Sequence, residues 1–576
     1  MKQRFCIIVF LLYFFLAVPS LQKPVEGWEW LNRSAAEHII KTGIPATGEL
    51  DYPENLLLIH PPSWCYLMGV SLKLFGYGDI QARLPGLIVM ALTGLLLWLL
   101  AKMILKSEAG PLIAIGLYLT NPFAIQGALS SDFTDGTLLP LAITGFILCW
   151  FYTAQWPLVK RIALLGACFS VCLWAKLTTP LALIPCIILV GVGCYGAKTA
   201  IILSVGVVLA GIGIFGATWL IYCKKLHLLL PGNFPFIDLF MTPFYYITGG
   251  EAALLPWELS LRDTAMQLTR IILWLGPLFL FVSIIGLSKR LQEIILNRKV
   301  DIEDIIWLLA IIVIMGYTFI QGGVGAFPKY YLTIVPLLAI YAARWITSEH
   351  QYLTKSTVFE RLLILLISTG YFYLVVGDYI YIFNHDIRNA LIFGGTKSAI
   401  AHLILKLVLY CVLPLSLWIF LKNSKSTLSF RSVICIFVFS AQIAISLLQG
   451  ISPYMTKYYY GTPINDVHSV IRMLKGIKEP RIIIAPKDFI YSAEAKAPIR
   501  SFSEVWDDPK KLKELISKYR PQAIVYGLPT HTVQWIQQVS SDSQLLQILH
   551  KNYIERQVGE FTIWLLIDDS QKIRIL

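Results

Sequence analysis

The sequence is dominated by apolar runs that are each close to the length needed to cross a lipid bilayer. Of its 576 residues, 56% are hydrophobic and only 14% are charged. A water-soluble protein of this size could not bury so much apolar surface, and a helix needs about 20 apolar residues to span the hydrocarbon core. We therefore predict an α-helical polytopic membrane protein of about thirteen transmembrane helices, at 5–21, 86–104, 111–129, 138–153, 161–177, 179–197, 199–222, 271–288, 304–320, 331–347, 360–380, 400–421 and 432–450.

The distribution of basic residues predicts how these helices are oriented. With the N-terminus in the cytoplasm, every inside loop carries Lys or Arg, whereas the outside turn at 130–137 carries only acids. This is the asymmetry expected of membrane proteins, and it explains most of the net charge of +13. The first run is compatible with a signal peptide or with an uncleaved helix, and we favour the helix. Either way, the loop that begins at residue 23 is predicted to lie on the outer side of the cytoplasmic membrane.

The composition changes after residue 450. We expect residues 1–450 to form the membrane domain and 451–576 a small extracytoplasmic α/β domain with a mostly parallel sheet. Its predicted strands are at 481–489, 522–528 and 561–567, and its predicted helices at 510–519 and 531–550. The sequence shows no nucleotide-binding glycine motif and no nucleic-acid-binding motif. The ten cysteines form no C-x-x-C pair, so neither a disulfide framework nor a zinc site is predicted.

Charged residues that could carry chemistry all fall on the predicted outer face. Charges within or beside membrane spans are costly and often functional, although a lysine at a helix end can also extend its ammonium group toward the lipid headgroups. Arg33 and Glu37 have helical spacing and are interpreted as a surface pair. The candidates are Glu26, Glu29, Glu37, His38, His60 and Arg83 in the first outside loop (23–85), with Asp132, Asp135, Lys176 and Lys329 farther along the chain.

Three segments resemble one enzyme group. They are HPPSWCYLMGVSLKLFGYGDIQARLP at 60–85, WAKLTTPLALIP at 174–185 and KYYLTIVPLLAIYAA at 329–343. Their order along the chain is similar to that in the protein O-mannosyltransferase and lipid A aminoarabinose transferase group of type C membrane glycosyltransferases. The resemblance implies transfer of a sugar from a polyprenyl-phosphate carrier (dolichyl or undecaprenyl phosphate) to an acceptor outside the cytoplasm.

The resemblance also implies a catalytic acid in the first outside loop. The family usually has Asp there, commonly followed by Glu, whereas this sequence has EGWEW at 26–30. Counting back from the Thr-Gly at 42–43 favours Glu29, and an acid four residues before an aromatic favours Glu26. His60 stands before Pro61, where the aminoarabinose transferases have Lys. We expect it either to contact the carrier phosphate or to cap a turn.

The residue types fit this reaction chemically. Displacing a phosphate from an anomeric carbon needs a base for the acceptor hydroxyl and cations for the leaving phosphate. Glu29 or Glu26 would be the base, and a single displacement would invert the anomeric centre. The phosphate would be bound by the basic candidates His60, Arg83, Lys176 and Lys329.

Asp132 and Asp135 are predicted to orient the acceptor or to bind a divalent cation, or else to cap the following helix. That cation is the one cofactor that the sequence suggests. The predicted partners are the polyprenyl-phosphate-linked sugar, a lipid, protein or glycan acceptor, and membrane lipids, with no nucleic acid. The alternatives are a secondary transporter, or a polysaccharide polymerase or ligase that uses lipid-linked sugars.

Overall fold

The computed structural model describes most of the membrane region and the sheet-forming part of the C-terminal segment. The described residues are 2–22, 29–47, 56–130, 134–232, 234–249, 271–272, 275–320, 328–348, 430–456, 458–459, 462–477, 483–485, 499–501, 509–526 and 541–567, with a few more between 396 and 408. The predicted span at 360–380 and most of that at 400–421 lie outside them, as do Glu26 and Asp132.

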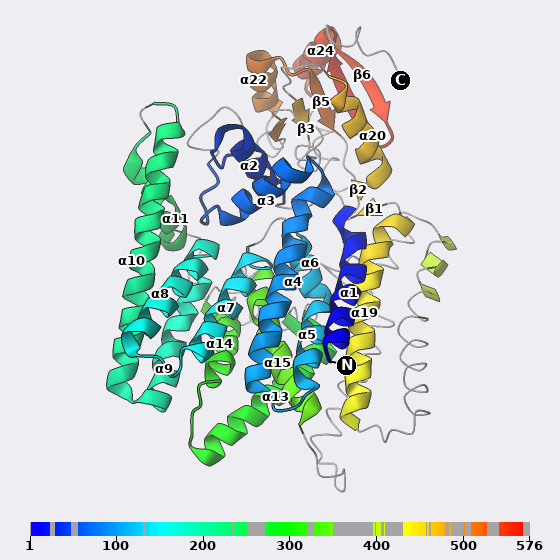
Figure 1. The fold of residues 1–576 in the computed structure, drawn as a ribbon. Coiled ribbons are helices and arrows are strands. Elements are labelled where there is room, and N and C mark those ends of the chain that lie inside the picture. The colour runs from blue at the N-terminus through cyan, green and yellow to red at the C-terminus, as the bar shows by residue number, and fades with distance from the viewer. Residues whose placement is uncertain are drawn as a thin grey trace.

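The membrane region is a bundle of helices (Figure 1). In chain order its first half contains α1 (Lys2–Ala17), η1 (Val18–Gln22), α2 (Glu29–Thr42), α3 (Ser63–Phe75), α4 (Asp79–Ile104), α5 (Gly110–Leu119), α6 (Pro122–Leu129), α7 (Leu138–Tyr152) and α8 (Leu158–Ala175). Its second half contains η2 (Thr179–Ala182), α9 (Leu183–Tyr195), α10 (Ala197–Leu229), α11 (Phe236–Gly249), α13 (Pro277–Asn297), α14 (Asp304–Met315), η3 (Gly316–Ile320), η4 (Pro328–Ile334), α15 (Val335–Thr347) and α19 (Phe430–Thr456).

Within the described part of the chain, six helices are long and apolar enough to cross a membrane. A seventh span results if the bent pair α5 and α6 is counted as one. The prediction of a helical polytopic membrane fold is confirmed, whereas the total of thirteen spans stays a prediction. The span expected at 271–288 is shifted, because α13 begins at Pro277 and continues to Asn297.

The bend between α5 and α6 has a local cause. Pro122 has no backbone N–H and cannot continue the helix that precedes it. The side chain of Asn121 restarts the chain as a helix by accepting a hydrogen bond of 3.0 Å from the Ala124 N–H. The axis turns by 55° at this point, which directs α6 toward the turn that carries Asp135.

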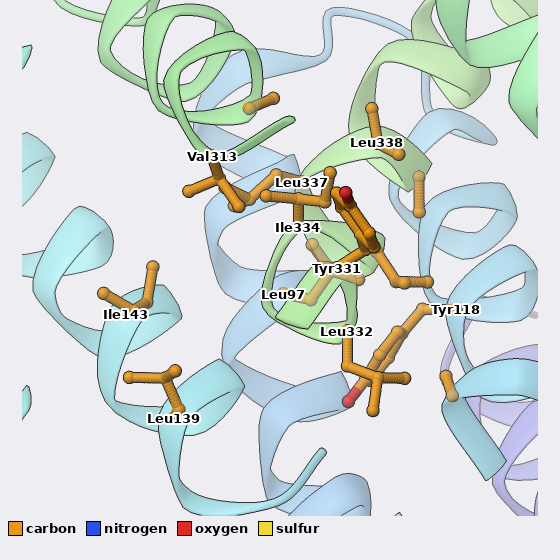
Figure 2. Packing of buried hydrophobic residues seen from close by; sticks show 14 of the residues in the cluster. Leu97, Tyr118, Leu139, Ile143, Val313, Tyr331, Leu332, Ile334, Leu337 and Leu338 are labelled. Atoms are coloured by element: carbon orange, nitrogen blue, oxygen red, sulfur yellow. The ribbon is translucent and has the colours of Figure 1, made fainter. Parts of the chain in front are cut away.

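The segment 329–347 lies at the centre of the bundle. It is 83% buried in its most apolar window, against 28–56% for the other five single-helix candidate spans. Figure 2 shows Tyr331, Leu332 and Leu337 packed among side chains from α4, α5, α7 and α14. Because protein surrounds this segment, its first residues, Lys329 and Tyr330, are held in a defined position. Its apolar sequence therefore reflects core packing more than contact with lipid.

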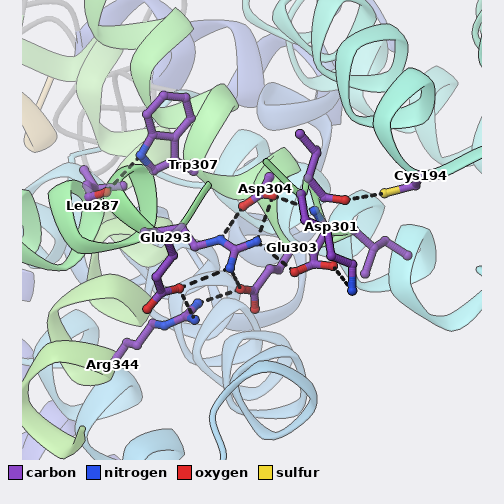
Figure 3. A network of polar contacts seen from close by, with 12 residues as sticks. Cys194, Leu287, Glu293, Asp301, Glu303, Asp304, Trp307 and Arg344 are labelled. Atoms are coloured by element: carbon purple, nitrogen blue, oxygen red, sulfur yellow. Dashed lines mark hydrogen bonds and ion pairs between the residues drawn. The ribbon is translucent and has the colours of Figure 1, made fainter. Parts of the chain in front are cut away.

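A network of charged side chains lies at the end of the bundle opposite α2 and α3, where α13 is connected to α14 (Figure 1). Arg290 of α13 donates hydrogen bonds from Nε to Asp304 Oδ1 (2.7 Å) and from Nη2 to Asp301 Oδ2 (3.0 Å). Arg344 of α15 donates to Glu303 (2.7 Å) and Glu293 (3.2 Å). Figure 3 shows these groups converging on the connection between α13 and α14. The guanidinium groups of Arg290 and Arg344 are thus neutralised by the carboxylates that they contact.

In the described residues of the C-terminal segment, five strands form one sheet with helices beside it. The strand order is β4-β3-β5-β7-β6, and β3 runs parallel to both β4 and β5, whereas β7 is antiparallel to β5 and β6. The sheet is therefore mixed, and the prediction of a mostly parallel sheet is wrong. Its elements are β3 (Ile483–Ala485), β4 (Ile499–Ser501), β5 (Ala523–Tyr526), β6 (Tyr553–Val558), β7 (Phe561–Leu566), α20 (Ile464–Lys475), α22 (Pro509–Tyr519) and α24 (Ser543–Asn552), preceded by a β1 (Tyr458–Tyr459) and β2 (Thr462–Pro463) pair.

The difference arises at the last hairpin. The expected final strand at 561–567 is present as β7, but the strand β6 before it was not predicted. Gly559, with φ of 58°, makes the tight turn that folds β6 back along β7. Figure 1 shows this sheet at the same end of the bundle as α2 and α3, opposite the start of α1.

Candidate active site

Lys176 and Asp135 form a buried ion pair at the end of the bundle where α8 stops. Lys176 follows the last residue of α8 in an extended conformation, and its Nζ lies 2.6 Å from Asp135 Oδ1. Each residue is only 2% exposed. Asp135 lies in the turn before α7, beside Gly136, where a Cβ would come within 2.3 Å of the Gly127 carbonyl oxygen. This close backbone approach holds the carboxylate in place.

Aromatic rings enclose the Lys176 ammonium group. Its Nζ lies 4.1 Å from the ring centroid of Tyr330 and 5.8 Å from that of Tyr317, and the two rings are stacked 4.7 Å apart. The Tyr317 hydroxyl is hydrogen-bonded to the Thr179 hydroxyl. Sequence reasoning missed these residues as site residues, although Thr179 and Tyr330 lie inside the resembling motifs. No sequence feature marked Tyr317 as a site residue, because it lies in the π-helical turn η3 at the end of an ordinary apolar run.

Lys176 keeps its positive charge in this setting. Burial by itself lowers the pKa of its ammonium group, but the Asp135 carboxylate, with Tyr317 and Tyr330, raises it by more. The net pKa is therefore raised above its ordinary value, and Lys176 is a cation at neutral pH. Lys329 adds a second ammonium group nearby, with its Nζ 5.8 Å from the centroid of the Tyr330 ring.

His60 belongs to the same cluster. Its pKa is lowered to about 4, first by burial and then by the charges of Lys176 and Lys329, with Asp135 opposing them. All three charges are therefore close enough to act on the imidazole. The loop is tied to this position by Ser63, whose hydroxyl donates to the Trp174 carbonyl oxygen (2.9 Å). His60 is accordingly neutral at pH 7, which leaves it one N–H donor and one acceptor nitrogen.

A second buried ion pair joins the first outside loop to α4. Arg83 Nη2 lies 2.8 Å from Glu29 Oε2, with both side chains at most 5% exposed, and Arg83 Nη1 donates to the Leu21 carbonyl oxygen (3.1 Å). The structure thus shows Arg83 paired with Glu29. Three residues later, a Cβ on Gly86 would lie 1.8 Å from the Ala128 carbonyl oxygen and 3.6 Å from Thr137. Both ion pairs therefore lie near the junction of α4, α6 and α7.

The predicted surface pair of Arg33 and Glu37 is wrong. Arg33 is 1% exposed and forms its ion pair with Asp79, at the start of α4. The helical spacing was interpreted correctly, but α2 packs against α3 and forms ion pairs with α4 instead of facing solvent. His38 is also buried, and its Nδ1 is 2.9 Å from the Ile44 carbonyl oxygen and from the Thr42 hydroxyl, contacts that hold the end of α2.

Glu37 gives the stability of the protein a pH dependence. Burial, aided by Asp79 and opposed by Arg33 and Lys41, raises its pKa from 4.5 to about 7. The folded state then binds the proton more tightly than the unfolded state, so this stabilisation is complete below pH 4.5 and is lost as the pH rises through about 7. We expect Glu37→Gln to leave the melting temperature nearly unchanged at pH 5 and to raise it at pH 8.

Thermal unfolding of purified protein between pH 5 and pH 8 measures this effect. Glu555→Gln, which neutralises an exposed carboxylate of β6, is the matched control and should follow the wild-type profile. Identical pH profiles for wild type and Glu37→Gln would show that Glu37 is not protonated in this range.

Within the residues that the structure describes, no three His, Cys, Asp or Glu side chains are grouped as they would be around a metal ion. Asp132 and Glu26 lie outside these residues, so their predicted roles stay predictions. The structure therefore gathers Asp135, Lys176, Lys329 and His60 in one cluster, and places Glu29 with Arg83 in another.

Comparisons with known proteins agree with the architecture. Residues 59–221 match the family model described as dolichyl-phosphate-mannose-protein mannosyltransferase. The crystal structure of ArnT from Cupriavidus metallidurans bound to undecaprenyl phosphate matches with a TM-score of 0.63 and 12% identity, covering 97% of each chain. Its apo state gives 0.62 and 13%, covering 97% of this chain and 96% of that one.

The archaeal oligosaccharyltransferase AglB from Archaeoglobus fulgidus, in complex with an inhibitory peptide and a dolichol-phosphate, matches with a TM-score of 0.50 and 12% identity. That alignment covers 100% of this chain and 75% of AglB. A comparison with curated protein sequences gave no match. The fold shared with ArnT, together with the mannosyltransferase signature across residues 59–221, confirms the predicted resemblance and, with it, the prediction of a membrane glycosyltransferase.

Proposed function

We propose that this protein transfers a sugar from a polyprenyl-phosphate carrier to a hydroxyl group of an acceptor on the outer face of the cytoplasmic membrane. The cluster of Lys176, Asp135, Lys329 and His60 is the observation that carries the proposal. Two ammonium groups and one carboxylate leave a net charge of +1 beside a neutral imidazole. An excess of positive charge beside the buried Lys176–Asp135 pair suits an anionic leaving group.

Lys176 and Lys329 are proposed to bind the carrier phosphate, with His60 donating a hydrogen bond as a neutral imidazole. Two of the fold relatives support this choice of ligand, since ArnT was solved with undecaprenyl phosphate and AglB with a dolichol-phosphate. Asp135 would orient Lys176 through their 2.6 Å contact. For Arg83 we propose a different role from the predicted phosphate contact, because its guanidinium group is already held by Glu29.

Glu29 is the proposed base, with Glu26 as the alternative. The Arg83 guanidinium fixes the Glu29 carboxylate, so one oxygen is oriented by the ion pair while the carboxylate remains an acceptor for a hydroxyl proton. Because the phosphate is already a good leaving group, attack by the acceptor hydroxyl needs no covalent enzyme intermediate. A single displacement of this kind inverts the anomeric centre.

The proposed sidedness follows from the charge pattern and from the position of the first loop. In Figure 1, α2 and α3 lie at the end of the bundle opposite the start of α1. With a cytoplasmic N-terminus, the clusters around Lys176 and Glu29, together with the proposed domain at 451–576, would all be extracytoplasmic. Asp132 is proposed to act on the acceptor or on a divalent cation.

Purified protein in liposomes, supplied with a panel of radiolabelled polyprenyl-phosphate hexoses and pentoses and of polyprenyl-diphosphate oligosaccharides, tests the function. We expect release of polyprenyl phosphate from at least one donor, with the label passing to an acceptor or, more slowly, to water. Absence of release from every donor contradicts the proposal. Turnover limited to diphosphate-linked oligosaccharides would instead favour the polymerase or ligase, and uptake of sugar without transfer would favour a transporter.

A further inference from the structure

Charged side chains of α2 and α4 form a row of ion pairs, called the ladder below, in which the third acid or base of α2 has no charged partner on α4. Glu29, Arg33 and Glu37 follow each other at four-residue spacing on α2, so they lie along one side of the helix. On α4, Asp79 and Arg83 have the same spacing. Glu29 pairs with Arg83, and Arg33 pairs with Asp79.

Glu37 occupies the third position of this ladder. The residue four before Asp79 is Phe75, at the end of α3, which offers no charge. Glu37 Oε1 is buried, and it has no hydrogen-bond partner among the residues that the structure describes. Arg33 is 1% exposed, and its Nε and Nη2 atoms are likewise buried with no hydrogen-bond partner in the described part of the chain. A buried polar atom without a partner costs free energy, so these three atoms point to a ligand.

The unpaired atoms define the chemistry of that ligand. Glu37 provides an acceptor, and the free edge of Arg33 provides two N–H donors. A cation would be repelled by Arg33, and an anion would be repelled by Glu37. A neutral group with several hydroxyls satisfies both, since each hydroxyl can donate to a carboxylate and accept from a guanidinium. Tyr77 adds an aromatic ring within electrostatic reach, because burial and then the charge of Glu37 raise its pKa.

We propose that Glu37 and Arg33 form a carbohydrate-binding subsite that holds a sugar unit of the acceptor. The position of the subsite indicates that it binds the acceptor and not the donor. Glu37 lies on the same helix as Glu29, eight residues away or about 12 Å along the axis. Glu29 is the proposed base for the acceptor hydroxyl, so an extended acceptor would reach both. This assignment to the acceptor depends on the proposed function, whereas the binding of a sugar does not. It makes the acceptor a glycan in preference to a bare polypeptide or lipid.

Saturation-transfer NMR on the full-length protein in nanodiscs tests the subsite with defined probes. The panel contains the methyl glycosides of neutral hexoses, pentoses and N-acetylhexosamines, and the neutral disaccharides built from them. We expect at least one probe to bind the wild-type protein, and Glu37→Gln to raise its Kd about tenfold. Glu555→Gln, an exposed carboxylate variant, should bind as the wild type does. Glu37→Leu, which fills similar space without an acceptor, should abolish binding.

The outcomes separate this inference from the proposed function. If no neutral sugar in the panel binds the wild type, or if binding survives in Glu37→Leu, the subsite is wrong and ordered water occupies the position. Hydrolysis of the polyprenyl-phosphate donor in the absence of acceptor is measured on the wild-type protein and on Glu555→Gln, which should retain it within about twofold. If the wild type turns over no donor, the proposed function fails, whatever the sugar-binding result.

Discussion

Replacing Lys176 by methionine is expected to lower kcat/KM for the polyprenyl-phosphate donor by about a hundredfold or more. Removal of one preorganised group that stabilises developing charge typically costs this much, and Lys176 lies at the centre of the cationic cluster. The same change leaves Asp135 buried without its counter-ion, which should destabilise the fold by about 3–5 kcal/mol. Steady-state release of polyprenyl phosphate, measured on the folded fraction, gives the activity.

The double variant Asp135→Asn with Lys176→Met separates the two effects. It removes both charges, so it should recover most of the lost melting temperature, because no unpaired buried charge remains. Its activity should stay as low as that of Lys176→Met, since the phosphate still lacks its cation. A double variant with wild-type kcat/KM would mean that the pair serves stability and takes no part in donor binding.

Glu29→Gln is the second large effect, with an expected loss of about 10²–10⁴-fold in kcat. Glutamine retains the size of the side chain and can accept the hydrogen bond from Arg83, but it cannot take a proton from an acceptor hydroxyl. The KM for the donor should change little, because the carrier phosphate is bound by other residues. Transfer from the donor identified in the panel, with initial rates at several donor concentrations, separates kcat from KM.

Glu26→Gln is the matched comparison, since it removes the neighbouring acid three residues earlier. We expect nearly wild-type kcat for Glu26→Gln if Glu29 is the base. The reverse pattern would transfer the role to Glu26. Full activity in both variants would show that neither acid is the base and that the Glu29–Arg83 contact is structural.

The gathering of Lys176, Asp135, Lys329 and His60 could be anticipated from sidedness alone. Each stands at the end of an apolar run or in a loop, and the positive-inside rule placed all of them on one face. The sequence could not show which charged side chains form ion pairs with each other. Arg33 was interpreted as a surface residue, because helical spacing identifies the side of a helix but not what covers it. Only the packing of α2 on α3, with the ion pair to Asp79 of α4, reveals that Arg33 is buried.

Other features depended on contacts between segments that are distant in the sequence. Tyr317 lies in an apolar run without any motif, and it becomes a neighbour of Lys176 only because the π-helical turn η3 meets η4. The charge network around Arg290 was likewise hidden, because the sequence does not show which nearby carboxylates contact this guanidinium group. In the C-terminal sheet, the Gly559 turn produces an antiparallel hairpin that the alternation of strands and helices did not indicate.

The position of a bound carrier phosphate tests the central claim most directly. An electron cryo-microscopy structure of the full-length protein in nanodiscs with undecaprenyl phosphate would locate the phosphorus atom. We expect a phosphate oxygen within hydrogen-bonding distance of Lys176 or Lys329 and near His60, at the same end of the bundle as Glu29. A phosphate bound at the Arg290 and Arg344 end, or away from both lysines, would contradict it.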